Sequence, residues 1–94
     1  MPSYKIAHIR VQSVDLIIVP MGNSFHFKSI ADKNNFTQSF QSCARNAGLA
    51  GTVVPVWNNG NAFNFLAPNN IRQFFRSIDM NYVLQNINKK LTCY

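Results

Sequence analysis

The chain has 94 residues, a formal net charge of +6, and 47% hydrophobic residues. This length predicts one domain over residues 1–94, and the apolar content excludes an intrinsically disordered protein. No apolar run approaches the ~20 residues of a membrane-spanning helix and no signal peptide is apparent, so a cytoplasmic protein without membrane contact is expected.

The first elements in the chain predict a β-hairpin. Residues 4–11 alternate in polarity as a strand does, and an apolar run at 16–19 ends at Pro20. The turn between them covers residues 12–14. Because the second run is apolar on both faces, both of its faces need cover. Helices are expected on one face, and a loop, the end of the chain or a second copy on the other.

A loop at 21–28 separates this hairpin from the first helix. Its aromatic residues Phe25 and Phe27 are expected to be exposed. Ser29 and Asp32 resemble a capping box that starts a helix. The helix carries an apolar stripe at 36, 40, 43, 44 and 47 and stops at Gly48, which is expected in the left-handed conformation.

Two further strands are predicted at 51–57 and 62–67, joined by the asparagine-rich turn at 58–61. Pro55 lies within the first of them. Because proline has no backbone N–H to donate, this strand is expected to be an edge strand or to carry a bulge.

Two helices complete the prediction. A short helix starts at Asn69 or Asn70, and a last helix starts at Asp79 and keeps Met80 and Leu91 on one face. The order is ββαββαα. We therefore expect an α+β domain, a two-layer sandwich in which helices pack on one face of a four-stranded sheet.

Two cysteines, Cys43 and Cys93, are expected to be free thiols, with a disulfide as the alternative. Neither belongs to a CxxC motif, so no metal site is expected. The sequence contains no phosphate loop, and no cofactor is expected.

The chain has few side chains that could act as a catalytic acid or base, because it contains no glutamate and three scattered aspartates. Small enzymes commonly use paired acids, or a histidine oriented by an acid. The remaining enzymatic alternative is a hydrolase or transferase that uses His8 or His26 with Asp15. His8, in a strand, is more simply explained as a structural histidine.

We expect instead a small binding module, a homodimer through the doubly apolar second strand, with a small molecule as a further ligand class. Trp57 is the strongest single anchor, because tryptophan is enriched at binding hot spots. The candidate ligand or interface residues are His8, Arg10, Phe25, His26, Phe27 and Trp57.

The positive charge supports a second function, nucleic-acid binding. The simpler alternative is that the excess of basic over acidic residues reflects a shortage of acids in an asparagine-rich composition, and not selection for an acidic partner. The residues that would contact phosphates are Lys5, Arg10, Arg72, Arg76, Lys89 and Lys90.

Four segments together resemble small uncharacterised bacterial proteins of the mobile integron gene-cassette type. The likeness covers nearly the whole chain, and it implies a bacterial, cytoplasmic accessory protein without assigning an activity or a functional residue. The segments are YKIAHIR (4–10), DLIIVP (15–20), AGLAGTVVPVW (47–57) and FFRSID (74–79).

Overall fold

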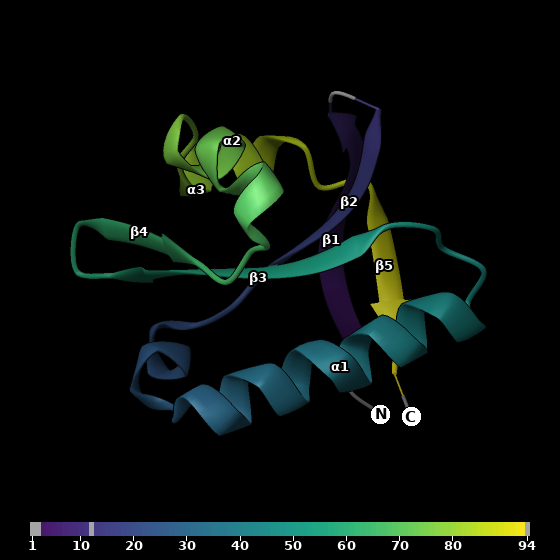
Figure 1. Ribbon diagram of the computed structural model, residues 1–94, viewed down its shortest axis with the longest axis horizontal. Helices are drawn as coiled ribbons and strands as arrows, with labels where there is room; N and C mark the ends of the chain where they lie inside the picture. Colours follow the sequence, from purple (N-terminus) through teal and green to yellow (C-terminus); the bar gives the residue numbers. More distant parts are fainter. Residues whose placement is uncertain (1–2, 12, 94) are drawn as a thin grey trace.

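The computed structural model describes residues 3–11 and 13–93 and contains one mixed five-stranded sheet with three α-helices (Figure 1). The α+β class is confirmed, but the expected four-stranded sheet is wrong. The sheet order is β4-β3-β2-β1-β5, with β2 and β3 parallel and the other neighbours antiparallel. The elements are β1 (Ser3–Val11), β2 (Val14–Pro20), the 3-10 helix η1 (Asn23–Phe27), α1 (Ile30–Asn46), β3 (Thr52–Asn59), β4 (Ala62–Phe65), the 3-10 helix η2 (Asn69–Ile71), α2 (Arg72–Arg76), α3 (Met80–Gln85) and β5 (Lys89–Thr92).

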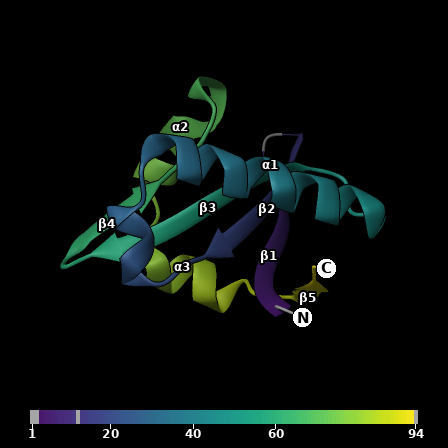
Figure 2. The ribbon, with the colours of Figure 1, turned by 90° about the horizontal axis from the view of Figure 1, so that it is seen from below.

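The helices cover both faces of the sheet, so the two-layer arrangement with helices on one face is wrong. Figure 1 shows α1 on one side of the strands and α2 with α3 on the other, and Figure 2 gives the view from the α1 side. In β2, Ile17 and Val19 belong to the core beneath α1, whereas Leu16 and Ile18 belong to the core beneath α2 and α3. A single chain therefore buries both faces of β2, and the structural reason for expecting a homodimer is removed.

The fifth strand replaces the end of the expected last helix. Helix α3 ends at Gln85, and the Asn86 side chain donates to the Tyr82 carbonyl at 2.7 Å. The Asn88 side chain then bonds both backbone groups of His8, at 2.9 and 2.8 Å. Because the outer edge of β1 needs hydrogen-bond partners, strand pairing overrides the helical spacing of the apolar residues.

Pro55 lies in β3, which has neighbours on both sides, so the expected edge position is wrong. The Pro55 carbonyl accepts from the Leu66 N–H at 3.1 Å, which places its nitrogen on the β4 side. Proline cannot return that hydrogen bond, and the paired part of β4 ends one residue earlier, at Phe65. The N–H that Pro55 lacks would therefore face a part of the chain that has already left β4.

The expected helix starts at Ser29 and Asp79 and the expected stop are confirmed, whereas the cap by Asn69 or Asn70 is wrong, because these residues lie within η2 and neither η2 nor α2 has a side-chain cap. The Ser29 hydroxyl accepts from the Asp32 N–H at 3.1 Å, and Asp79 accepts from the Tyr82 N–H at 3.0 Å. Gly48 has a φ of +81°, the left-handed conformation that ends a helix. Gln12, the first residue of the expected hairpin turn, lies outside the described residues.

Gly51 is required where β3 begins beside β2. A Cβ at this position would lie 2.9 Å from the carbonyl oxygen of Asp15, and the φ of +138° is unfavourable for any L side chain. This glycine allows the two parallel strands to start in register, with Thr52 opposite Leu16.

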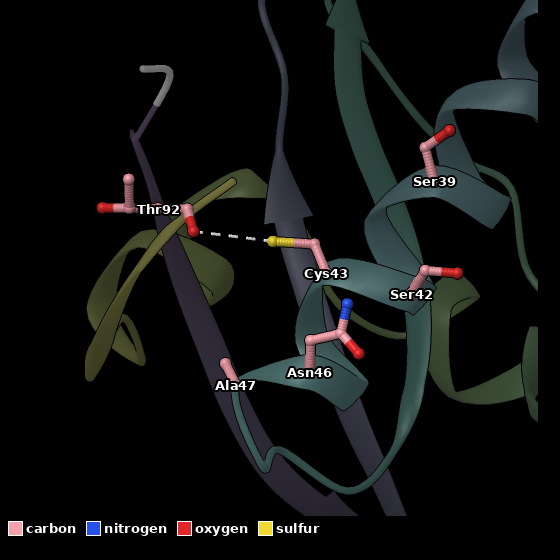
Figure 3. Close-up of a pocket in the computed structure, with 6 residues that line it drawn as sticks. All are labelled: Ser39, Ser42, Cys43, Asn46, Ala47 and Thr92. Atoms are coloured by element: carbon pink, nitrogen blue, oxygen red, sulfur yellow. Dashed lines mark hydrogen bonds between the residues drawn. The ribbon is translucent and has the colours of Figure 1, made fainter. Parts of the chain in front are cut away.

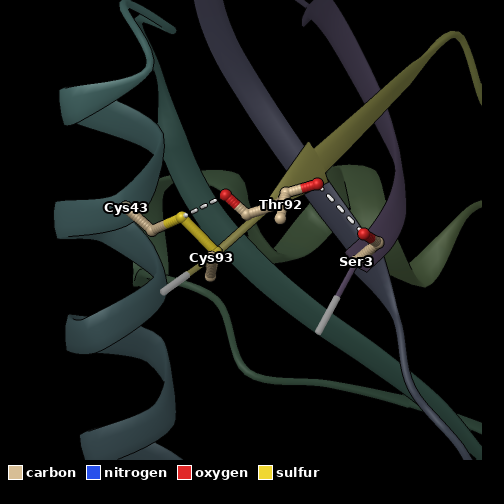
Figure 4. Close-up of a disulfide and its surroundings, with 4 residues drawn as sticks. All are labelled: Ser3, Cys43, Thr92 and Cys93. Carbon is tan, nitrogen blue, oxygen red and sulfur yellow. Dashed lines mark hydrogen bonds between the residues drawn. A yellow bond between two sulfur atoms is a disulfide. The ribbon is translucent and has the colours of Figure 1, made fainter. Parts of the chain in front are cut away.

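Cys43 and Cys93 form a disulfide, so the expectation of free thiols is wrong (Figure 4). The cause is β5, which carries Cys93 back to α1, where a continued helix would not have placed it. Disulfides are rare in reducing compartments, so the cytoplasmic location stays a prediction that this bond does not favour. In the described part of the chain, no helix is long and apolar enough to cross a membrane.

Candidate functional site

Four of the six candidate interface residues meet at one end of β3. Phe25, His26 and Phe27 come from η1, and Trp57 comes from β3. Two residues that the sequence did not single out complete the group. We call this group the His26 corner: Phe25, His26, Phe27, Lys33, Trp57 and Asn59.

The main chain brings η1 to β3 directly after β2 ends. The Met21 N–H donates to the Val56 carbonyl at 2.7 Å, which extends the parallel pairing by one bond. The chain then turns through η1, and the Phe25 ring packs against Trp57 with a centroid distance of 5.0 Å. Phe25 is buried, so the expectation that it is exposed is wrong.

The His26 ring is held at both nitrogens. The Trp57 indole Nε1–H donates to His26 Nδ1 at 3.3 Å, and the Asn59 side-chain amide lies 3.2 Å from Nε2. Because an indole only donates, Nδ1 accepts and the neutral ring carries its proton on Nε2. The structure places Asn59 Nδ2 at this nitrogen, and exchanging the amide nitrogen and oxygen lets the oxygen accept from Nε2–H.

Lys33 supplies a buried cation to the same corner. Its side chain is 9% exposed, its Nζ donates to the His26 carbonyl at 3.1 Å, and it lies 5.0 Å from the centroid of the Trp57 ring. The hydrogen bond and the cation–π contact both compensate for lost hydration. The sequence held a signal for Lys33, because it lies three residues before Phe36 on the apolar stripe and its stem can be buried.

Two exposed apolar residues, which we call the tip, lie at the corner and directly after it in the chain: Phe27, and Ile30 at the start of α1. Their side chains are 80% and 66% exposed, and the Phe27 ring meets the His26 ring edge-on at 5.4 Å. The expected exposure of Phe27 is confirmed.

His8 and Arg10 lie elsewhere, on β1. His8 Nε2 lies 2.8 Å from the Ala50 carbonyl oxygen, so this ring fastens the loop between α1 and β3. Arg10 and Asp15 form an exposed ion pair at 3.9 Å. Such a surface pair contributes ~1 kcal/mol or less to stability.

The proposed pairing of His26 with Asp15 is not formed. Asp15 lies beside Gly51 at the start of β3, whereas His26 bonds Trp57 near its end. Six residues of extended strand separate these contacts by ~20 Å. A base and the acid that orients it must lie within hydrogen-bond reach.

The six basic residues proposed for nucleic-acid binding are exposed, and Arg72 and Arg76 lie on α2. Lys5 and Lys90 are paired on the face of the sheet that carries α2 and α3, because Ala7 on the same face belongs to that core. Arg10 and Lys89 lie on the α1 face, in register with Asp15 and Ile6 respectively.

Within residues 3–11 and 13–93, no group of three His, Cys, Asp or Glu side chains could hold a metal ion. No family model matches the chain, and no significantly similar curated protein or solved structure was found. The resemblance to integron cassette proteins therefore stays a prediction.

Proposed function

We propose that this chain is a small non-enzymatic binding module that recognises an acidic segment of another protein through the His26 corner. The observation that carries the proposal is the tip of Phe27 and Ile30, which stands exposed on a base whose polar groups are already bonded to one another. A preorganised aromatic side chain loses little conformational entropy on binding.

The charge of the molecule favours an acidic partner over a second copy. The net charge is +6, exposed Lys28 adjoins Phe27, and the Lys33 ammonium lies within the corner. Two copies of the chain would repel each other, whereas an acidic partner would be attracted and oriented. The occupant we propose is an apolar side chain flanked by carboxylates.

Nucleic-acid binding has less support than protein binding. The six basic residues divide between two faces of the sheet, so fewer of them can follow one phosphate backbone. The enzymatic alternative requires a free base. Both ring nitrogens of His26 are bonded, whereas His8 donates from Nε2 to the Ala50 carbonyl and keeps Nδ1 as an acceptor.

Selection from a random peptide library displayed on phage tests the proposal. We expect enriched peptides that carry an aromatic or aliphatic residue between Asp or Glu residues. Phe27→Ser should weaken their binding at least tenfold, as is typical of a hot-spot residue. Leu84→Ser is the matched control, because Leu84 is 52% exposed on α3, away from the corner.

Sedimentation of wild type and Phe27→Ser identifies a competing occupant. A wild-type dimer that becomes a monomer in Phe27→Ser would show that a second copy covers the tip, and would contradict the heterologous partner. Equal loss of peptide binding in Phe27→Ser and Leu84→Ser, or no enriched peptide, would also overturn the proposal.

A further inference from the structure

Pairing with β1 and the Asn88 side chain, which bonds the His8 backbone, hold β5 to the sheet. This strand is a four-residue edge strand that pairs only with β1, and Leu91 is its one buried residue among Lys89–Thr92. The Ser3 and Thr92 hydroxyls are 3.0 Å apart, and both residues are exposed to competing water. Such an edge belongs to the part of a fold that opens most easily.

A pair of like charges opposes this strand pairing. Lys5 and Lys90 lie directly opposite each other on β1 and β5, and both side chains are exposed. Like charges at opposed positions destabilise a sheet. Among the residues that the structure describes, neither lysine forms an ion pair, because the one salt bridge joins Arg10 to Asp15.

The covalent connection is the Cys43–Cys93 disulfide, which links α1 to the residue directly after β5 (Figure 4). The Cys43 sulfur also lies 3.6 Å from the Thr92 carbonyl oxygen. A disulfide sulfur carries no proton to donate, so in the oxidised protein this is a contact and not a hydrogen bond. The disulfide therefore adds a covalent connection to the hydrogen bonds that hold β5.

The disulfide is reachable from outside. Cys43 borders a cavity of about 290 Å³ that is lined by both polar and apolar atoms (Figure 3). It also borders a second cavity of about 170 Å³, which Cys93 shares. The first is close to the size of the smallest ligand pockets. Its lining residues are Ser39, Ser42, Cys43, Asn46, Ala47 and Thr92.

We propose that the Cys43–Cys93 disulfide is a reversible thiol–disulfide exchange site for a small thiol compound, and that its reduction releases β5 from β1 while the rest of the fold persists. This inference is independent of the proposed function, because β5 is separated from β3 in the sheet by β1 and β2.

Reduction of the disulfide consumes two molecules of the same small thiol. A thiolate attacks one sulfur of the disulfide, the S–S bond breaks, and the other cysteine leaves as a thiolate that takes a proton. A second thiolate attacks the mixed disulfide, which frees the first cysteine. The protein gains two electrons and two protons as two thiols, and the two small thiols are oxidised to their own disulfide.

Release of β5 would change two surfaces at once. The backbone groups of Tyr4 and Ile6, which face β5, would lose their partners, and Leu91 would leave the core beneath α1. The core beneath α2 would stay covered, because its cluster with Phe75 contains no residue of β5, and the core beneath α1 would keep Phe40 on β2 and β3 after losing Leu91.

Amide hydrogen exchange of the native protein, before and after reduction by dithiothreitol, tests the proposal. Reduction should increase exchange at Tyr4, Ile6 and Leu91 by about 100-fold, while the amides of Ile18 and Val54 keep their protection. Retained protection in β5 of the reduced protein would overturn the release. Simultaneous loss of protection throughout the chain would show a structural cross-link and would also overturn it.

The variant Lys90→Glu tests the role of the like-charge pair. In the reduced protein it should place opposite charges on β1 and β5 and slow exchange at Leu91 about threefold. Lys89→Glu is the matched control, because Lys89 lies opposite Ile6 and not Lys5. Equal effects of the two variants would contradict a specific repulsion between Lys5 and Lys90.

The route of the thiol is tested with reduced glutathione as the probe. Ser42→Trp should fill the larger cavity and slow reduction of the disulfide about tenfold, because access limits the rate of exchange. Arg45→Trp is the control, since Arg45 is exposed on the same helix but does not line this cavity. Equal reduction rates in both variants would exclude the cavity as the entry route.

Discussion

The His26 corner and the β5 edge both join segments that are distant in sequence, but they do so by different means. At the corner, η1, α1 and β3 are connected through matched donors, acceptors and aromatic contacts around Trp57. At the edge, a disulfide fixes a strand that buries one side chain, Leu91. The first connection depends on packing, whereas the second depends on the redox chemistry of the surroundings.

We therefore expect the corner to keep its structure in oxidised and reduced protein, and the β5 edge to change with the redox state. A partly buried network with aromatic packing resists change, because a bond broken in its buried part would leave a polar group unsatisfied. An exposed edge has no such penalty, since water replaces its hydrogen bonds. The corner is therefore suited to presenting a fixed surface, and the edge is suited to change.

The largest effect is expected from Trp57→Ala. Removal of this buried ring should lower the free energy of unfolding by about 3–5 kcal/mol, since it leaves a cavity beside Phe25 and exposes Lys33. Urea denaturation measures the loss. Trp57→Phe keeps an aromatic ring and should lose about half as much or less. A loss below about 1 kcal/mol for Trp57→Ala would show that the corner is not a packed unit.

A smaller loss is expected when both cysteines are replaced by serine. The disulfide closes a loop of 50 residues, for which chain entropy gives up to about 4 kcal/mol. If β5 is released in the variant, its regained freedom offsets part of this loss, so urea denaturation should give less than the full value. A loss of the full value with β5 still protected from hydrogen exchange would contradict the contrast between the two regions.

Lys33→Met should change stability by about 1 kcal/mol or less. Methionine retains the apolar stem, and removal of a buried charge also removes its desolvation cost. The comparison variant is Lys33→Ala, which removes the stem as well and should lose more. If Lys33→Met is as damaging as Lys33→Ala in urea denaturation, the ammonium itself and not the stem holds the corner together.

The smallest effect on stability is expected for Phe27→Ser. The Phe27 side chain is 80% exposed, so its loss should change the free energy of unfolding by about 0.5 kcal/mol or less. Thermal unfolding of the variant measures this. A larger loss would place Phe27 in the core of the corner and would remove it as a free contact residue.

The sequence predicted the features of the fold that depend on local chemistry. The caps Ser29 and Asp79 and the stop at Gly48 follow from side-chain oxygens and the freedom of glycine, so they could be predicted. The last strand could not, because Met80 to Leu91 has helical spacing and only pairing with β1 decides against it. The disulfide was missed for the same reason, since β5 places Cys93 beside α1.

The sequence predicted which residues belong to the candidate site, but it did not predict how they are arranged. Phe25, His26, Phe27 and Trp57 were named from residue type, but their meeting depends on the parallel pairing of β2 with β3. That pairing brings η1 to the end of β3, and no local pattern encodes it. His8 was also named as a candidate, but the simpler explanation as a structural histidine is confirmed, since its ring holds the loop at Ala50.

The most direct measurement follows the Trp57 indole Nε1–H and the Leu91 amide together, by NMR, in oxidised and reduced protein. The indole proton should keep its protection and its chemical shift after reduction, because its bond to His26 belongs to the constant part of the fold. The Leu91 amide should exchange freely. Loss of both signals together, or protection of both, would contradict the distinction between a fixed corner and a releasable edge.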